Sequence, residues 1–354
     1  MRERIVYVLG AGFSAPLGLP LVGNFITMSK DLYFGNPRGY PHFSTIYDQF
    51  GKMASAKNYY TANLLSIEEV LSILEMESTV TGDSETRDRF IQFLKDTITF
   101  YTPKFEGSIW DGHFRTSAEG LVCAFLASMT GFRATRYKHG QDERFCLPPS
   151  SQYALISLNY DLVLERALNV LSGIPFAQRE GIGHSQLDFQ REGTGFRESQ
   201  VALAKLHGSV DSNIVPPTWN KMIQEEVGKA WHLAYTALSD ATQIRIIGYS
   251  LPIMDSYVRY LFKAAILRSQ HLKHIDIICL DDGGVRDRYC SFVSFPSARF
   301  IGDKGVGEYF EALGRAQEAQ ESTLIPPALK LSFPDLDDLH KKFFLKNGTP
   351  LHQG

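Results

Sequence analysis

The chain has 354 residues, which is enough for two ordinary domains or for one large domain with an insertion. Hydrophobic residues make up 44% and charged residues 21% of it, a balance that is typical of folded globular proteins and excludes disordered and fibrous classes. The 36 basic and 39 acidic side chains give a net charge of −3, so no overall charge attracts nucleic acid, and direct nucleic-acid binding is not expected.

The cysteines are Cys123, Cys146, Cys279 and Cys290, and no two of them form a C-x-x-C pair. This spacing indicates neither a disulfide framework nor a four-cysteine zinc site. No apolar run approaches the ~18 residues that crossing a membrane requires, and glycines interrupt the first apolar stretch too early for a leader. We therefore expect a cytoplasmic protein in a reducing compartment, without zinc and without a membrane partner.

The first predicted element is a strand over residues 5–9, a short β-branched run that ends abruptly at Gly10. Apolar residues at helical spacing follow Asn159 and again follow Asp255, so helices alternate with strands. Further runs that predict strands are residues 153–158, 201–206, 244–247 and 275–280, with 299–301 as a weaker candidate. This alternation predicts an α/β protein with a doubly wound parallel sheet, a Rossmann-like fold.

Roughly 140 residues separate the first two strands, far more than a single crossover needs. Ser66 and Glu69 form a capping box before an apolar helix face, and residues 89–100 and 118–129 also have helical patterns. We therefore expect an inserted helical subdomain over residues 31–150. Residues 316–354 form a tail that is either a contact surface for a partner or a terminal helix packed on its own sheet.

The run from Gly10 to Ser14 lies between a strand and a helix, where glycines let backbone N–H groups approach a phosphate. The alternative is a tight strand-to-helix turn without a ligand. Ser14 either bonds the ligand or caps the first helix. Asp281 follows the last strong strand, at the sheet edge where doubly wound folds bind ligands.

Asn159 and His207 each follow a predicted strand and are candidate catalytic residues. Asn159 offers a donor and an acceptor that suit a bound water or hydroxyl, or it caps the helix that begins near Tyr160. His207 has a pKa range suited to proton transfer, although a structural histidine is the alternative. Asp161 either orients Asn159 and polarises the water, or it satisfies the helix dipole.

Four motifs in order resemble signatures of the sirtuin-like family. They are the run from Gly10 to Pro20, Ser157-Leu158-Asn159-Tyr160-Asp161, Lys205-Leu206-His207-Gly208-Ser209, and the run from Ile246 to Pro252 followed by Asp255. The resemblance implies that residues 1–30 and 151–315 form a Rossmann-like NAD-binding domain. It places the NAD pyrophosphate at Gly10, Ala11, Gly12, Phe13 and Ser14, and the adenosine ribose at Gly248 and Ser250. From their position at the sheet edge, either Asp281 or Asp282 is expected to contact adenosine. For Asp255 we favour the helix N-cap position over a contact with ribose.

Deacetylases of that family carry Asp-Phe-Arg after the first motif and two C-x-x-C pairs, whereas here Leu21-Val22-Gly23 follows Pro20 and those pairs are missing. The chain therefore resembles the prokaryotic, zinc-less branch, which is similar to NAD hydrolases of antiphage defence. The resemblance implies cleavage of NAD+ to nicotinamide and ADP-ribose, with Asn159, His207 and Asp161 as the catalytic residues. An NAD-dependent deacylase or ADP-ribosyltransferase, and a non-catalytic sensor of NAD or ADP-ribose, remain as alternatives.

Such an enzyme depletes NAD+ and must be controlled. By analogy with the family we expect a homo-oligomer, or a separately encoded partner such as a HerA-like ATPase or an Argonaute-like protein. We also expect residues 66–76 of the insertion to close part of the nicotinamide end of the site.

Overall fold

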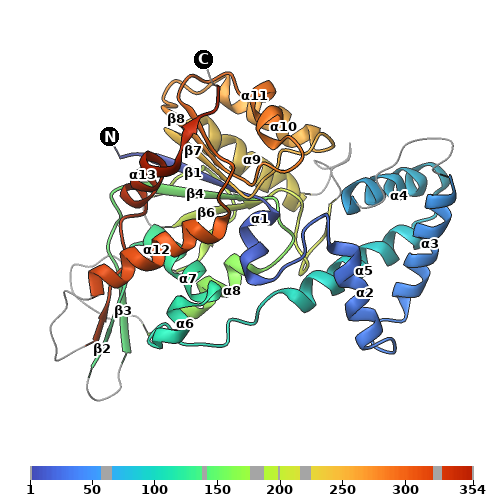
Figure 1. Ribbon diagram of the computed structural model, residues 1–354, viewed down its shortest axis with the longest axis horizontal. Helices are drawn as coiled ribbons and strands as arrows, with labels where there is room; N and C mark the ends of the chain where they lie inside the picture. The colour runs from blue at the N-terminus through green and yellow to red at the C-terminus, as the bar shows by residue number, and fades with distance from the viewer. Residues whose placement is uncertain are drawn as a thin grey trace.

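A computed structural model describes residues 2–56, 66–137, 142–175, 187–197, 200–215, 225–321 and 329–352. An eight-stranded sheet lies at the centre of the molecule (Figure 1). Its strands in chain order are β1 (Arg4–Leu9), β4 (Gln152–Ser157), β5 (Phe189–Gln190), β6 (Val201–Lys205), β7 (Gln243–Ile247), β8 (His274–Ile278), β9 (Ala298–Ile301) and β11 (Thr349–Pro350).

The spatial order of the strands is β11-β9-β8-β7-β1-β4-β6-β5. Every pair is parallel except β11 with β9. From β1 the chain builds outward through β4 and β6, and then returns to the other side of β1 with β7, β8 and β9. This order confirms the predicted doubly wound parallel sheet, and all six predicted strands form.

The side chains of β1 alternate between two cores. Ile5, Tyr7 and Leu9 face one core, and Val6 and Val8 face the other; all five are fully buried. A strand buried on both faces must be apolar throughout, which explains its continuous β-branched pattern. The first face is covered by α7 (Ala118–Thr130), α8 (Val163–Ser172), α12 (Val306–Glu321) and α13 (Leu336–Asn347), and the second by α9 (Glu225–Asp240), α10 (Ser256–Ile266) and α11 (Val285–Phe292) (Figure 1).

The inserted segment forms a group of helices on one side of the sheet (Figure 1). They are α2 (Phe25–Gly35), α3 (His42–Ala56), α4 (Ile67–Thr81) and α5 (Glu85–Tyr101). Aromatic rings hold the group together, with the Phe43 and Phe93 centroids 4.7 Å apart. One of the two hydrogen bonds of the predicted capping box is present, because the Ser66 hydroxyl accepts from the Glu69 amide at 3.3 Å.

Part of residues 31–150 is not helical. After the short helix α6 (Gly112–Thr116) and α7, the strands β2 (Phe132–Arg136) and β3 (Asp142–Cys146) form a hairpin. Strand β10 (Leu329–Leu331) pairs with β2, so this small antiparallel sheet joins the insertion to the tail. The helical pattern did not predict this hairpin.

The described part of the tail is built into the main core. In α13 the side chains of His340 and Phe344 are at most 1% exposed, and β11 then adds to the sheet edge beside β9. Of the two interpretations of the tail, the structure shows the terminal helix packed on its own sheet.

Arg245 of β7 explains why α13 packs there. Its guanidinium is completely buried, donates to the Tyr7 hydroxyl at 2.7 Å and forms an ion pair with Asp337 of α13. A buried charge without a partner costs several kcal/mol, so removing the carboxylate would leave β7 with an uncompensated cation. The tail helix therefore supports the central strand that also carries part of the site described below.

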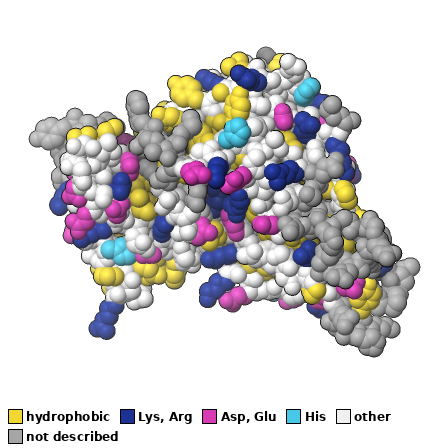
Figure 2. All heavy atoms as spheres, turned by 180° about the vertical axis from the view of Figure 1, so that it is seen from behind, with side chains coloured by type: hydrophobic (Ala, Val, Ile, Leu, Met, Phe, Trp, Pro, Cys, Tyr) yellow, Lys and Arg dark blue, Asp and Glu magenta, His cyan; other side chains and the backbone are white. Residues whose placement is uncertain are grey.

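Two further observations concern the surface. Among the described residues, the helices are too short or too polar to cross a bilayer. On the face that Figure 2 shows, Lys and Arg side chains stand among Asp and Glu side chains.

The buried His340 predicts a pH dependence of stability. Burial and the positive charge of Arg245 lower the pKa of His340 to about 3, although a hydrogen bond to Asp276 opposes the shift. An unfolded histidine takes up a proton below its ordinary pKa of 6.5, so between pH 6.5 and 3 the unfolded chain binds more protons than the folded chain. The free energy of unfolding therefore falls as the pH drops through this window.

We expect His340→Gln to reduce the difference in unfolding free energy between pH 7 and pH 5, measured by urea titration. The exposed His271 provides the control, and His271→Gln should keep the wild-type difference. An undiminished difference in His340→Gln would contradict the assignment.

Candidate active site

A cavity of about 380 Å³ opens at the carboxyl ends of β1, β4, β6 and β7. This is the point where the strand order reverses beside β1, the usual ligand position in a doubly wound sheet. The predicted site residues that line it are Gly10, Ala11, Ser14, Asn159, Asp161, His207, Gly248 and Ser250.

The glycines of the first turn let two loops pack against each other. The Gly10 amide donates to the Ile247 carbonyl at 3.0 Å, and the Gly12 amide donates to the Gly248 carbonyl at 2.9 Å. A Cβ on Gly10 would lie 2.5 Å from the Gly248 oxygen. The helix that follows, α1 (Ala11–Ser14), has only four residues. Two of the N–H groups expected at a phosphate thus hold the loops together, while Gly10, Ala11 and Ser14 face the cavity.

Three of the predicted binding residues lie outside the cavity lining. Gly12 packs on Gly248, with a would-be Cβ 2.7 Å from the Gly248 Cα. Phe13 is 1% exposed and packs on the Phe310 ring at 5.3 Å, which anchors the turn in the core. Asp281 is exposed, and its carboxylate accepts a hydrogen bond from the Arg286 amide at 2.9 Å in the first turn of α11.

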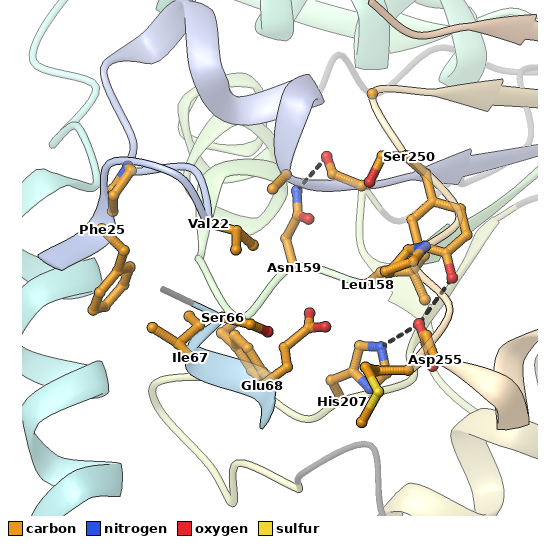
Figure 3. Close-up of a pocket in the computed structure, with 18 of the residues that line it drawn as sticks. Val22, Phe25, Ser66, Ile67, Glu68, Leu158, Asn159, His207, Ser250 and Asp255 are labelled. Atoms are coloured by element: carbon orange, nitrogen blue, oxygen red, sulfur yellow. Dashed lines mark hydrogen bonds and ion pairs between the residues drawn. The ribbon is translucent and has the colours of Figure 1, made fainter. Parts of the chain in front are cut away.

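Asn159 is held by the glycine turn. Its amide nitrogen donates to the Gly10 carbonyl at 3.0 Å and to the Ser14 hydroxyl at 3.2 Å, and its amide oxygen points into the cavity (Figure 3). The helix α8 begins at Val163, whose amide donates to Asp161 at 3.1 Å. The capping role that we considered for Asn159 is therefore wrong, because Asp161 performs it.

Ser14 links Asp161 to Asn159. Its hydroxyl donates to the Asp161 carboxylate at 2.8 Å while it accepts from Asn159. A hydroxyl has one hydrogen to donate, so Ser14 in this state has none to donate to a phosphate, and its oxygen makes no capping hydrogen bond to the helix that follows. Burial raises the pKa of Asp161, although the positive charge of Lys205 and the Ser14 hydrogen bond oppose the shift. Asp161 thus orients Asn159 through Ser14, one of its two expected roles.

The imidazole of His207 lies against the carboxylate of Asp255. The distance from Nε2 to Oδ2 is 3.3 Å, and both side chains are at most 3% exposed. The same carboxylate oxygen accepts a hydrogen bond from the Tyr249 hydroxyl at 2.9 Å (Figure 3). A carboxylate in this position orients an imidazole and stabilises its protonated form.

Our preferred N-cap position for Asp255 is confirmed, but the side chain does not act as the cap. The residue does stand at the N-cap of α10, but its side chain makes no capping hydrogen bond there. It turns instead toward His207, a partner that lies on another strand. The signal was present in the sequence, since Asp255 follows the motif that ends at Pro252.

Sequence reasoning also missed two charged residues that line the cavity. Arg288 of α11 donates to the Ser250 carbonyl at 3.0 Å and to the Gly283 carbonyl at 2.7 Å, which fixes a positive charge at one side. Glu68 of α4 extends toward the space between Asn159 and His207 (Figure 3). The expected approach of residues 66–76 is confirmed for the first turn of α4, since Ser66, Ile67, Glu68 and Glu69 line the cavity.

No protein-family model matches the chain, and no curated protein matches it. Among solved structures, a Sir2 complex with a p53 peptide and NAD+ is 14% identical, with a TM-score of 0.40; the match covers 91% of this chain and 95% of that chain. A Sir2 complex with the inhibitor EX-527, 2′-O-acetyl-ADP-ribose and a deacetylated p53 peptide is 13% identical, with a TM-score of 0.38 and coverage of 89% and 93%. Within the described residues, no group of three or more His, Cys, Asp or Glu side chains is arranged to hold a metal ion.

The contact between the two loops predicts that Gly248→Ala is strongly destabilising. Its Cβ would lie 2.3 Å from the Phe13 nitrogen, and the residue has a φ of +67°. Gly283 is a matched control, because its φ is +62° but nothing lies within 4 Å of a Cβ there. We expect Gly283→Ala to cost about 1 kcal/mol and Gly248→Ala about 2–4 kcal/mol. If urea unfolding gave both variants the same loss of unfolding free energy, the close approach of the loops would contribute nothing to stability.

Proposed function

We propose that this protein is an NAD+ glycohydrolase, which converts NAD+ and water to nicotinamide, ADP-ribose and a proton. The observation that carries the proposal is the meeting of Asn159 and the His207–Asp255 pair in one cavity beside the glycine turn. The four sirtuin-like motifs of the sequence supply every one of these residues.

The chemistry of the bond explains why these groups suit it. Cleavage between nicotinamide and ribose passes through an oxocarbenium-like state, which a water must meet on one face of the sugar. The amide oxygen of Asn159 accepts a hydrogen bond from that water or from a ribose hydroxyl. His207 takes the proton that the water loses, and Asp255 stabilises the resulting imidazolium.

The rest of the cavity suits a dinucleotide. The guanidinium of Arg288 beside Ser250 offers a cation for the pyrophosphate. Val22 and Phe25 form an apolar wall where a flat ring can pack. A volume of about 380 Å³ lies within the range of small-molecule sites.

The biological role is part of the same proposal. The resemblance to zinc-less, prokaryotic sirtuin-like proteins supports an effector that depletes NAD+ in antiphage defence. This role implies a protein partner. The candidates are a second copy of the chain, a HerA-like ATPase and an Argonaute-like protein.

The direct test is to incubate the purified protein with NAD+ and follow nicotinamide release by chromatography. We expect His207→Ala and Asn159→Ala each to lower turnover by roughly 10²-fold or more, because each removes a group that acts on the reacting atoms. His232 is an exposed histidine of α9, and His232→Ala should retain wild-type turnover.

The other outcomes identify the competing functions. Release of nicotinamide only in the presence of an acylated peptide would indicate a deacylase. Tight binding of NAD+ without any release would indicate a sensor. Full turnover by His207→Ala would remove the histidine from the mechanism.

Ser14→Ala tests the link between Asp161 and Asn159. Loss of both hydrogen bonds of this positioning hydroxyl should lower kcat about tenfold, while KM for NAD+ changes little because Ser14 does not hold the substrate. A raised KM with an unchanged kcat would show that Ser14 binds the substrate directly.

A further inference from the structure

The inserted segment delivers a carboxylate to a cavity that the sheet otherwise builds. Ser66 caps α4 through the Glu69 amide, which fixes the first turn of that helix against the cavity mouth. Glu68, in the same turn, directs its carboxylate toward the space between Asn159 and His207 (Figure 3).

An acidic residue in a first helical turn needs no function, because it interacts favourably with the helix dipole. Glu68 differs from such a residue because its charge also acts on other residues that line the cavity. Burial, followed by the negative charges of Glu68 and Asp255, raises the pKa of Tyr160 well above its usual value. Glu68 also contributes, after burial and Asp255, to the raised pKa of Tyr249. The negative charge of Glu68 therefore acts on Tyr160, whose ring lies beside that of His207, and on Tyr249, which donates to Asp255.

The nicotinamide ring of NAD+ carries a positive charge, whereas the ring of NADH is neutral. As the bond to ribose breaks, the ring becomes neutral and the positive charge moves to the anomeric carbon. A fixed carboxylate beside these atoms favours the cation in the ground state and again in the transition state.

The charges of the cavity also set the direction of the ligand. Arg288 stands beside Ser250, which lies across the cavity from Glu68 (Figure 3). The phosphates of a dinucleotide are favoured at the arginine, and a cationic ring is favoured at the glutamate. The opposite orientation would place phosphates against Glu68 and is disfavoured.

We propose that Glu68, supplied by the insertion, is a specificity-determining and catalytic residue. Its carboxylate selects the oxidised, cationic nicotinamide over the reduced one, and it stabilises the positive charge that forms at the ribose. The inference rests on the proposed function for the identity of the substrate. In this role Glu68 acts through the charge of its carboxylate and forms no covalent bond.

The test compares Glu68→Gln, which removes the charge and keeps the size, with Glu77→Gln, which makes the same change at an exposed position of the same helix. Binding of NAD+ and NADH is measured by calorimetry with His207→Ala added, so that NAD+ survives the titration. We expect Glu68→Gln to lose roughly tenfold of the preference for NAD+ and, with His207 intact, to lower kcat/KM by roughly 10-fold to 100-fold. Glu77→Gln should change neither quantity.

Glu68→Asp retains the charge on a shorter side chain and should keep a measurable part of the preference, which separates charge from shape. Unchanged preference and kcat/KM in Glu68→Gln would overturn the inference while the proposed hydrolysis stands. A wild-type protein that releases no nicotinamide, yet prefers NAD+ in a manner that depends on Glu68, would overturn the hydrolysis and the catalytic role of Glu68 and keep its role in specificity.

Discussion

The close approach of the loops after β1 and β7 is the constraint on which the site depends. Gly10 and Gly248 meet at a distance that admits no Cβ, and two backbone hydrogen bonds close the contact. Because the loops occupy the same edge of adjacent parallel strands, their contact forms the floor of the cavity. The Gly10 carbonyl also accepts a hydrogen bond from the Asn159 side chain. The backbone contact between the two loops therefore also orients Asn159, in the loop after β4.

The polar groups of the site are buried in connected sets. Asp161, Ser14 and Asn159 form one chain of hydrogen bonds, and His207, Asp255 and Tyr249 form another. Burial makes each unpaired polar group costly, so every member restricts the orientation of the next. The cavity thus presents an amide oxygen and an imidazole from separate, rigid supports, which is the preorganisation that bond cleavage benefits from.

The parts of the fold that could be predicted are those with a strong local cause. The strand at residues 5–9 is buried on both faces, so its composition alone reveals it. The two residues of β11 carry no periodicity, and their pairing depends on α13. At Asp255 local propensity predicted a cap, but a tertiary partner, His207, takes the carboxylate. The sequence predicted that residues 66–76 approach the site but did not single out Glu68, because no sequence pattern shows which side chain at a helix end faces a cavity.

The ion pair between Arg245 and Asp337 has a consequence for how the protein is made. The carboxylate lies 92 residues further along the chain than the arginine, so it leaves the ribosome well after β7. Until it arrives, β7, the strand that leads into Gly248, carries Arg245 without its acidic partner. The cavity floor beside β7 therefore gains its full support only once α13 has been synthesised, so completion of the site is tied to a late step of chain synthesis.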